Sequence, residues 1–206
     1  MNDIDFASFL VSRVCHDLVG PMGAVVNGLE VLEDERDAAM RADALKIVTQ
    51  SAGQALARLQ FLRIAFGAAG STGAELDLGE VGRLVSGLLS GSKVKLEWQP
   101  TQMNWPKDWA KLLMNATMLA ADCLPRGGVV RVTTSDATTP PSFRIQASGP
   151  HAKVLEEVEK ALQGEANHGP VDARGIQPFL THKIANGLGA GLRFFSRDGA
   201  IELAAG

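Results

Sequence analysis

The residues best suited to chemistry are His16 and Asp17, which are adjacent in the stretch that spans residues 13–22. A neutral imidazole is a nucleophile, and a neighbouring carboxylate can hold its proton on Nδ1 and leave Nε2 free to attack. At about 3.6 residues per helical turn, His16 points nearly opposite to the apolar residue Leu18. We therefore expect an exposed His16 as the reactive group and Asp17 as the residue that orients its ring, although Asp17 also fits a solvated helix acid.

The stretch around His16 has the apolar pattern of one long bundle helix. Pro21 lacks the N–H that would bond the carbonyl of Asp17, which costs about 3 kcal/mol and kinks a helix. The apolar residues fall within about 40° of one direction, opposite His16. They are Val11, Val14, Leu18, Met22, Val25, Leu29 and Leu32.

The His16 side of this helix also suits contact with another protein. Glycines on both sides of the proline leave a low surface that a partner's backbone could approach. Arg13 could attract a phosphate-bearing partner and Phe9 could belong to a docking patch, although each also fits an ordinary surface residue. The predicted partner-binding residues are Phe9, Arg13, Gly20, Pro21, Gly23 and Asn27.

Composition excludes several classes of protein. The chain has 206 residues, 46% of them hydrophobic, with a net charge of −3 and a pI of about 5.8, so no basic surface favours nucleic acid or an anionic membrane. Cys15 and Cys123 lie in different patterns, which fits a reducing compartment without disulfides. No apolar run reaches the roughly 18–20 residues that cross a bilayer, and no secretion signal is present. We expect a cytoplasmic protein, and no metal because no further ligands gather near Cys15 and His16.

The N-terminal part predicts two antiparallel helices. The first begins at a cap on Asn2 or Asp3 and runs to about Glu33, and Asp37 caps the second. In the second helix apolar residues recur at spacings of three and four. They include Leu45, Val48, Ala52, Leu56, Leu59 and Phe66. Because the two apolar stripes are longer than one partner helix can cover, we expect a second copy to complete a dimeric four-helix bundle.

The small residues at 67–73 indicate a linker between two domains, one at 1–68 and one at 74–206. The second domain mixes helices and strands, with Asp77 capping one helix and Pro106 opening another. The expected helices span about 77–89, 106–124, 151–162 and 176–186, and the expected strands about 93–98, 129–133, 143–146, 191–195 and 200–203. The fold class is therefore α+β: a helical hairpin followed by an α/β sandwich in which helices back a mixed sheet.

His16, Asp17, Leu18 and Pro21 resemble the phosphoacceptor motif of histidine kinase dimerisation domains, in which the histidine is followed by an acid, a leucine and, five positions on, a proline. Val19 departs from the basic residue that is common in that motif. The order of elements in the second domain resembles the ATP-binding domain of the same kinases over essentially its whole length. The resemblance implies that His16 is phosphorylated.

The kinase-like domain lacks residues that such kinases use to hold nucleotide. The alignment keeps Asn115, but Leu119 replaces the asparagine that holds magnesium and Asp122 replaces a lysine. Ala147 replaces the adenine-binding aspartate, and His151 replaces a glycine. Without these oxygen ligands Mg²⁺ loses preferred coordination, and the adenine amino group loses its acceptor.

Two other stretches do not restore the nucleotide site. Residues 175–178 stand where a flexible lid is expected, with Pro178 making the turn rigid. The glycine run at 187–191 follows a helix and precedes a strand, which is the reverse of a phosphate-binding loop. We therefore expect no ATP, no cofactor, no metal and no autokinase activity.

The histidine motif, the dimerising hairpin and the degenerate kinase domain together resemble the ChpT-type histidine phosphotransferases of alphaproteobacterial phosphorelays over the whole chain. This resemblance implies that a homodimer takes a phosphoryl group from a receiver-domain aspartate of a hybrid histidine kinase onto His16. The group then passes to response regulators, including a cell-cycle transcription factor, and the receivers supply Mg²⁺. Two alternatives stay open: an ATP-dependent histidine kinase with an atypical pocket, and a non-catalytic dimeric adaptor that only binds receivers.

Overall fold

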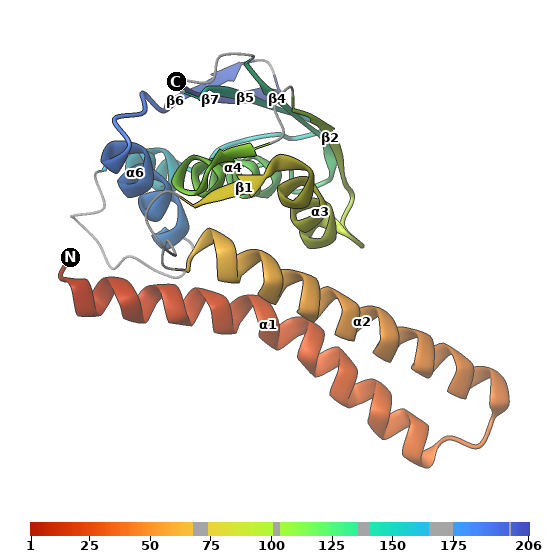
Figure 1. Ribbon diagram of the computed structural model, residues 1–206. Coiled ribbons are helices and arrows are strands. Elements are labelled where there is room, and N and C mark those ends of the chain that lie inside the picture. The colour runs from red at the N-terminus through yellow and green to blue at the C-terminus, as the bar shows by residue number, and fades with distance from the viewer. Residues whose placement is uncertain (68–73, 101–103, 136–140, 165–174, 198) are drawn as a thin grey trace.

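Two long helices form an N-terminal hairpin, α1 (Asp3–Asp34) and α2 (Ala38–Ala65). The computed structural model describes residues 1–67, 74–100, 104–135, 141–164, 175–197 and 199–206. The Asn2 side chain caps α1 by accepting from the Asp5 N–H, and the Asp37 side chain caps α2. Both caps and the antiparallel pairing are as the sequence predicts (Figure 1).

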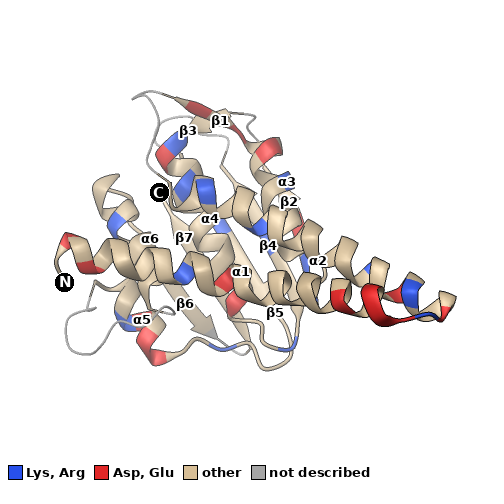
Figure 2. Cartoon of the chain, turned by 90° about the horizontal axis from the view of Figure 1, so that it is seen from below, with Lys and Arg blue, Asp and Glu red and all other residues tan. Residues whose placement is uncertain are grey.

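The first helix continues through Pro21 and bends near its middle (Figure 1). Pro21 leaves one carbonyl without its helical N–H partner, which explains a bend rather than an end. Between Asp17 and Glu30 the helix carries no charged residue, and Figure 2 shows this stretch in the tan of uncharged residues.

The two helices pack tightly against each other at Gly28, the buried residue of α1. A Cβ atom at Gly28 would lie 2.6 Å from Val48 Cγ2 and 3.5 Å from the Ala44 carbonyl oxygen. A β-branched side chain has little freedom to move aside in a helix. A glycine is therefore needed at this crossing.

Among the described residues, the C-terminal part contains a five-stranded sheet, a two-stranded sheet and four helices. The helices are α3 (Leu78–Leu89), α4 (Lys107–Asp122), α5 (Glu156–Leu162) and α6 (Ile176–Gly187). The large sheet has the order β2-β4-β5-β7-β6 and contains β2 (Val94–Gln99), β4 (Gly128–Thr134), β5 (Phe143–Ser148), β6 (Arg193–Arg197) and β7 (Ala200–Ala205). Only β2 and β4 pair in parallel, so the sheet is mixed, as expected.

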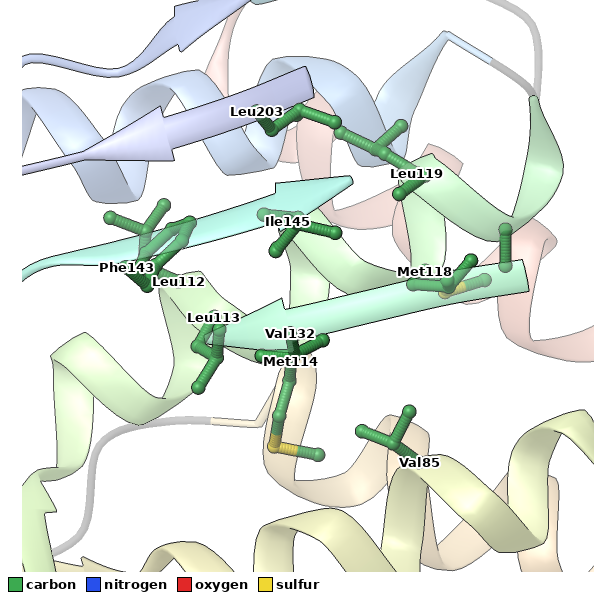
Figure 3. Close-up of a cluster of buried hydrophobic side chains, with 14 of the residues drawn as sticks. Val85, Leu112, Leu113, Met114, Met118, Leu119, Val132, Phe143, Ile145 and Leu203 are labelled. Atoms are coloured by element: carbon green, nitrogen blue, oxygen red, sulfur yellow. The ribbon is translucent and has the colours of Figure 1, made fainter. Parts of the chain in front are cut away.

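The molecule is layered, with the sheet on one side, α3, α4 and α6 beneath it and the hairpin below these helices (Figure 1). In β5 the side chains of Phe143, Ile145 and Ala147 alternate with exposed residues and face the helices. Figure 3 shows the resulting cluster, in which side chains of α4 meet those of β4, β5 and β7. This buried face fixes the position of α4 and hence of its last residue, Asp122.

The hairpin is not separated from this core, because the last turns of α2 contribute buried residues to it. Phe61, Leu62 and Ala65 are buried within the same hydrophobic cluster as α3 and α4. The predicted division at 68 and 74 stays a prediction, because residues 68–73, most of the predicted linker, lie outside the described residues.

Two expectations about the elements need correction. The helix expected from His151 begins only at Glu156, because His151 has a φ of 61° and so cannot belong to a right-handed helix. The short antiparallel pair β1 (Glu75–Asp77) and β3 (Asn104–Pro106) was not expected. Three residues are too few to show a strand's alternation of apolar and polar side chains.

The expectation about membrane segments also changes, because α1 is long and apolar enough to cross a bilayer by length and composition. An 18-residue window of this helix reaches a mean hydropathy of 1.3. The sequence pattern did not indicate this segment because His16, Asp17 and Glu30 interrupt its apolar run. In the fold this helix packs along α2 as half of the hairpin.

Two glycines of α1 should respond oppositely to substitution by alanine. A Cβ atom at Gly23 would meet nothing within 4 Å, so Gly23→Ala should raise the free energy of unfolding by about 0.5–1 kcal/mol through helix propensity. Gly28→Ala should lower it by about 1–2 kcal/mol, because the added methyl overpacks the crossing. Urea unfolding at one fixed protein concentration measures both. Stabilisation by both substitutions would contradict a tight crossing at Gly28.

Candidate functional site

His16 lies in α1 with its ring in solvent, and 75% of the side chain is exposed. Its Nδ1 is 3.2 Å from Oδ1 of Asp17. Because an ionised carboxylate only accepts hydrogen bonds, the tautomer that satisfies this contact carries the proton on Nδ1. The lone pair of Nε2 is then available on the other side of the ring.

Asp17 is largely buried, unlike its neighbour, with only 8% of its side chain exposed. Its Oδ2 accepts a hydrogen bond of 3.0 Å from Nε of Arg13, one turn earlier in α1. Its two oxygens therefore have different partners, the His16 ring and the Arg13 guanidinium. A solvated surface acid would have neither this burial nor this pair of contacts, so that alternative does not hold.

Arg13 extends from α1 toward the C-terminal part, where its Nη2 lies 3.5 Å from Oδ2 of Asp122 at the end of α4. Only 12% of the Arg13 side chain is exposed. The sequence was compatible with a cation that attracts a phosphate-bearing partner and equally with an ordinary surface arginine. The charge of Arg13 instead lies between two carboxylates, which leaves less of it for a partner.

Asp122 has several charged neighbours. Burial raises the pKa of its carboxyl, and the charge of Asp17 adds to the effect, while Arg13 and Arg58 lower it. Because 55% of the Asp122 side chain is exposed, water offsets much of the cost of burying the charge. Asp122 thus lies within ion-pair distance of Arg13, at the edge of the buried contact between Arg13 and Asp17.

The other predicted partner-binding residues all lie along α1. Gly20 and Gly23 are exposed, and a Cβ atom at either would meet nothing within 4 Å. Asn27 is exposed, whereas Phe9 and Pro21 are partly buried. The open backbone expected around the proline is therefore present, and Phe9 is less accessible than the sequence suggested.

A groove of about 460 Å³ opens beside His16, between α1 and the C-terminal part. The side of the groove opposite α1 is lined by residues in α4, in or near α5, and in α6. The sequence offered no reason to associate them with the histidine. They are Leu119, Cys123, Lys153, Leu155, Val158, Gln177 and Pro178. No local pattern could have identified them, since only the packing of these helices against α1 brings them near His16.

The two positions at which the kinase resemblance expects nucleotide ligands are part of the core. Leu119 is buried, and Figure 3 shows its side chain next to Leu203 of β7. Ala147 is fully buried in β5, where it pairs with Val130 and Ile201 on the neighbouring strands. These side chains offer no oxygen to a metal or a base.

Asn115, the residue kept from the kinase pattern, has a structural role here. Its Nδ2 donates to the carbonyl of Ala65 at the end of α2 and to the carbonyl of Lys111. Nε2 of Gln177 in α6 donates to the Asn115 backbone carbonyl at 2.9 Å. Asn115 thus joins α2, α4 and α6, and residues of α4 and α6 line the groove.

His151 replaces an expected glycine and keeps that residue's backbone geometry, with a φ of 61°. Histidine tolerates this left-handed region better than most residues. Nη1 of Arg126 lies 2.8 Å from Nε2 of His151, so this ring already has a partner. Among the described residues, no group of three or more His, Cys, Asp or Glu could hold a metal ion.

The fold and this site define a class of protein in which a helical hairpin bearing an exposed histidine is joined to a kinase-like α/β domain. Residues 78–200 match the family model described as histidine phosphotransferase C-terminal domain. The chain is 35% identical to the protein phosphotransferase ChpT of Brucella abortus (strain 2308) over 189 residues, which covers 92% of this chain and 89% of that protein. The chain belongs to the histidine phosphotransferase family, and it is a phosphotransferase of a phosphorelay.

Solved structures agree with this assignment. A bacterial phosphotransferase superposes with a TM-score of 0.89 at 33% identity, covering 100% of this chain and 98% of the other. The histidine kinase domain of the blue-light activated kinase EL346 from Erythrobacter litoralis superposes with a TM-score of 0.50 at 15% identity, covering 89% and 94%. The second likeness shows a shared fold and confirms the expected kinase-like architecture.

The two cysteines should differ strongly in reactivity. Burial, with a smaller effect of Asp122, raises the pKa of the Cys123 thiol to about 12, whereas Cys15 is exposed. At mildly alkaline pH a thiol reagent should modify Cys15 quickly and Cys123 about a thousandfold more slowly than an ordinary thiol. Mass spectrometry over time measures both rates, and Cys15→Ser should remove the fast phase. Fast labelling of Cys123 in the folded protein would contradict its burial.

Proposed function

We propose that His16 takes the phosphoryl group from the phosphoaspartate of one receiver domain and passes it to the aspartate of another. The Nε2 lone pair of His16 attacks phosphorus, the bond to the receiver carboxylate breaks, and the carboxylate leaves with the electron pair. The second transfer reverses these steps on another receiver. The observation that carries this proposal is the exposed His16 ring with Nδ1 in contact with Asp17.

Asp17 has two tasks in this proposal. It keeps the proton on Nδ1, which leaves Nε2 free, and its charge stabilises the positive charge that grows on the ring as the Nε2–phosphorus bond forms. The burial of its carboxylate supports the second task, because a charge with little water around it acts more strongly on its neighbour.

The receivers supply Mg²⁺ in this proposal, and the protein needs no cofactor of its own. Phosphoryl transfer depends mainly on in-line positioning and on neutralising charge at the transferred group. The apolar side chains of Leu119 and Ala147 support the absence of ATP binding, since neither can replace the ligands that the kinase resemblance expects. Autokinase activity is accordingly not part of the proposal.

The partners of a phosphorelay phosphotransferase are kinases or response regulators. We propose that the donor is a hybrid histidine kinase and that the recipients are response regulators, including a cell-cycle transcription factor. The exposed backbone at Gly20 and Gly23, with Asn27 and Pro21, suits the approach of a receiver along α1 toward His16. The groove beyond His16 would let the C-terminal domain contribute to the choice of receiver.

We propose further that the protein is a homodimer in which two hairpins form a four-helix bundle. A row of apolar side chains on both helices is exposed in the single chain, which is unusual unless another surface covers it. They include Val11, Met22, Val26, Leu29 and Val31 of α1 and Met40, Leu45, Ile47, Leu56 and Leu59 of α2. A second copy presents the matching surface. Covering this face in a bundle also accounts for the hydropathy of α1 without a membrane, which supports a cytoplasmic protein.

Labelled phosphate distinguishes a phosphotransferase from a kinase. A phosphorylated receiver with Mg²⁺ should label the wild-type protein, and labelled ATP with Mg²⁺ should not. His16→Gln should lose labelling by more than about a thousandfold, because it removes the nucleophile. His151→Asn is the matched control. Asparagine tolerates the same positive φ, and the His151 ring is not at this site.

Three outcomes of this experiment would contradict the proposal. Labelling of His16 by ATP without another protein would make the chain a kinase with an atypical pocket. Labelling by neither donor, with receiver binding intact, would make it an adaptor, and the adaptor would keep its cellular role in the His16→Gln variant. Equal losses in the His151→Asn control would place the effect in folding rather than in chemistry.

The dimer can be tested with two residues of nearly equal exposure. Leu56 of α2 and Phe195 of β6 are 56% and 55% exposed. Leu56→Asp should shift the protein from dimer to monomer in analytical ultracentrifugation, with the dissociation constant raised at least about a hundredfold, because a buried charge opposes the bundle. Phe195→Asp should leave the dimer unchanged. The reverse result would place the interface on the sheet.

A further inference from the structure

One chain of polar contacts runs from the C-terminal part of the molecule to the reactive histidine. It leads from Asp122 Oδ2 to Arg13 Nη2 at 3.5 Å, from Arg13 Nε to Asp17 Oδ2 at 3.0 Å, and from Asp17 Oδ1 to His16 Nδ1 at 3.2 Å. Asp122 is the last residue of α4, whereas the other three residues lie in α1. This chain of contacts joins the domain without a phosphoacceptor to the helix that bears it.

The two middle residues in this series of contacts, Arg13 and Asp17, are shielded from water. Only 12% of the Arg13 side chain and 8% of the Asp17 side chain are exposed. Water therefore competes weakly for their hydrogen bonds, and a change in the orientation of one group passes to the other. Each also uses two separate atoms for its two contacts, Nε and Nη2 in Arg13 and Oδ1 and Oδ2 in Asp17.

The charges explain why the contact with Asp122 matters. A second carboxylate at Nη2 limits rotation of the Arg13 guanidinium about its Nε contact with Asp17. Arg58 of α2 also acts electrostatically on Asp122, so the carboxylate lies between one arginine from each hairpin helix. The kinase resemblance expects a lysine at position 122, and a lysine there would repel both arginines.

We propose that Asp122 is a positioning residue for phosphotransfer: it fixes Arg13, which fixes the Asp17 carboxylate that orients the His16 ring. The proposal rests on the proposed role of His16. Asp122 contacts Arg13 and not the His16 ring, so in this proposal it acts through Arg13. The degenerate kinase domain thereby contributes to the readiness of the histidine in addition to any part in receiver docking.

The state of the ring can be measured without any partner. In protein labelled with ¹⁵N-histidine, the shifts of Nδ1 and Nε2 report the tautomer of His16, and the spectrum of His16→Gln identifies its signals. The wild-type ring should carry its proton mainly on Nδ1. Asp122→Asn should move population to the Nε2–H tautomer, and the matched control Asp43→Asn, in an exposed part of α2, should not.

The rate of labelling by a phosphorylated receiver gives the second measurement. Asp122→Asn should lower it by about three- to tenfold, since loosened positioning costs rate. Arg13→Ala should lower it by at least as much, and adding Asp122→Asn to Arg13→Ala should have no further effect, because the two residues act in one chain. Asp122→Glu should recover part of the rate.

Several results would overturn the proposal. The proposal fails if the losses of labelling rate in Asp122→Asn and Arg13→Ala add up in the double variant. It also fails if Asp122→Asn changes the labelling rate but not the tautomer of His16, because that result would indicate a role in docking. An unchanged tautomer in Asp122→Asn would also contradict it, whatever the rate. Melting curves identify a variant that fails to fold. If Asp122→Asn is such a variant, the labelling rates of Asp122→Glu and Arg13→Ala are compared instead. If the wild-type protein accepts no phosphate, the proposed function fails, while the tautomer measurement still decides whether Asp122 orients the ring.

Discussion

The structure depends on one contact between an exposed imidazole and a buried carboxylate, His16 and Asp17. A histidine that reacts with other proteins has to stand in solvent, where a ring turns freely. In the proposed transfer, burial of the neighbouring acid Asp17, rather than of the histidine, would orient the ring and leave it accessible. The cost is a carboxylate with little water around it, and Arg13 compensates that charge.

The C-terminal domain supports this arrangement. It has a kinase-like fold, but apolar side chains stand at the positions where the kinase resemblance expects residues that bind nucleotide. Leu119 and Ala147 extend the hydrophobic core, and Asn115 joins three helices through its hydrogen bonds. His151 keeps a backbone turn that the resemblance assigns to glycine. These side chains pack α4 into the core, and Asp122 at its end lies 3.5 Å from Arg13. The fold has thus kept its architecture while its side chains serve packing and positioning.

The sequence predicted the elements well where local rules are strong. Asn2, Asp37 and Asp77 cap the helices expected to follow them, because a side-chain oxygen can satisfy the first free N–H groups without tertiary help. It failed where local signals are weak, as for β1 and β3. It also failed at His151, whose left-handed backbone delays α5 although the following residues suit a helix.

By itself, the sequence determined that His16 points away from the apolar stripe of its helix, since helical periodicity alone sets that direction. It also predicted the hairpin and the mixed sheet, and it put Leu119 and Ala147 at positions where the kinase resemblance expects polar ligands. Only the tertiary structure decided that Arg13 lies between Asp17 and Asp122, and that Lys153 and Leu155 line a groove beside the histidine. These contacts join residues far apart in the chain, and long-range packing, which no local pattern encodes, brings them within reach.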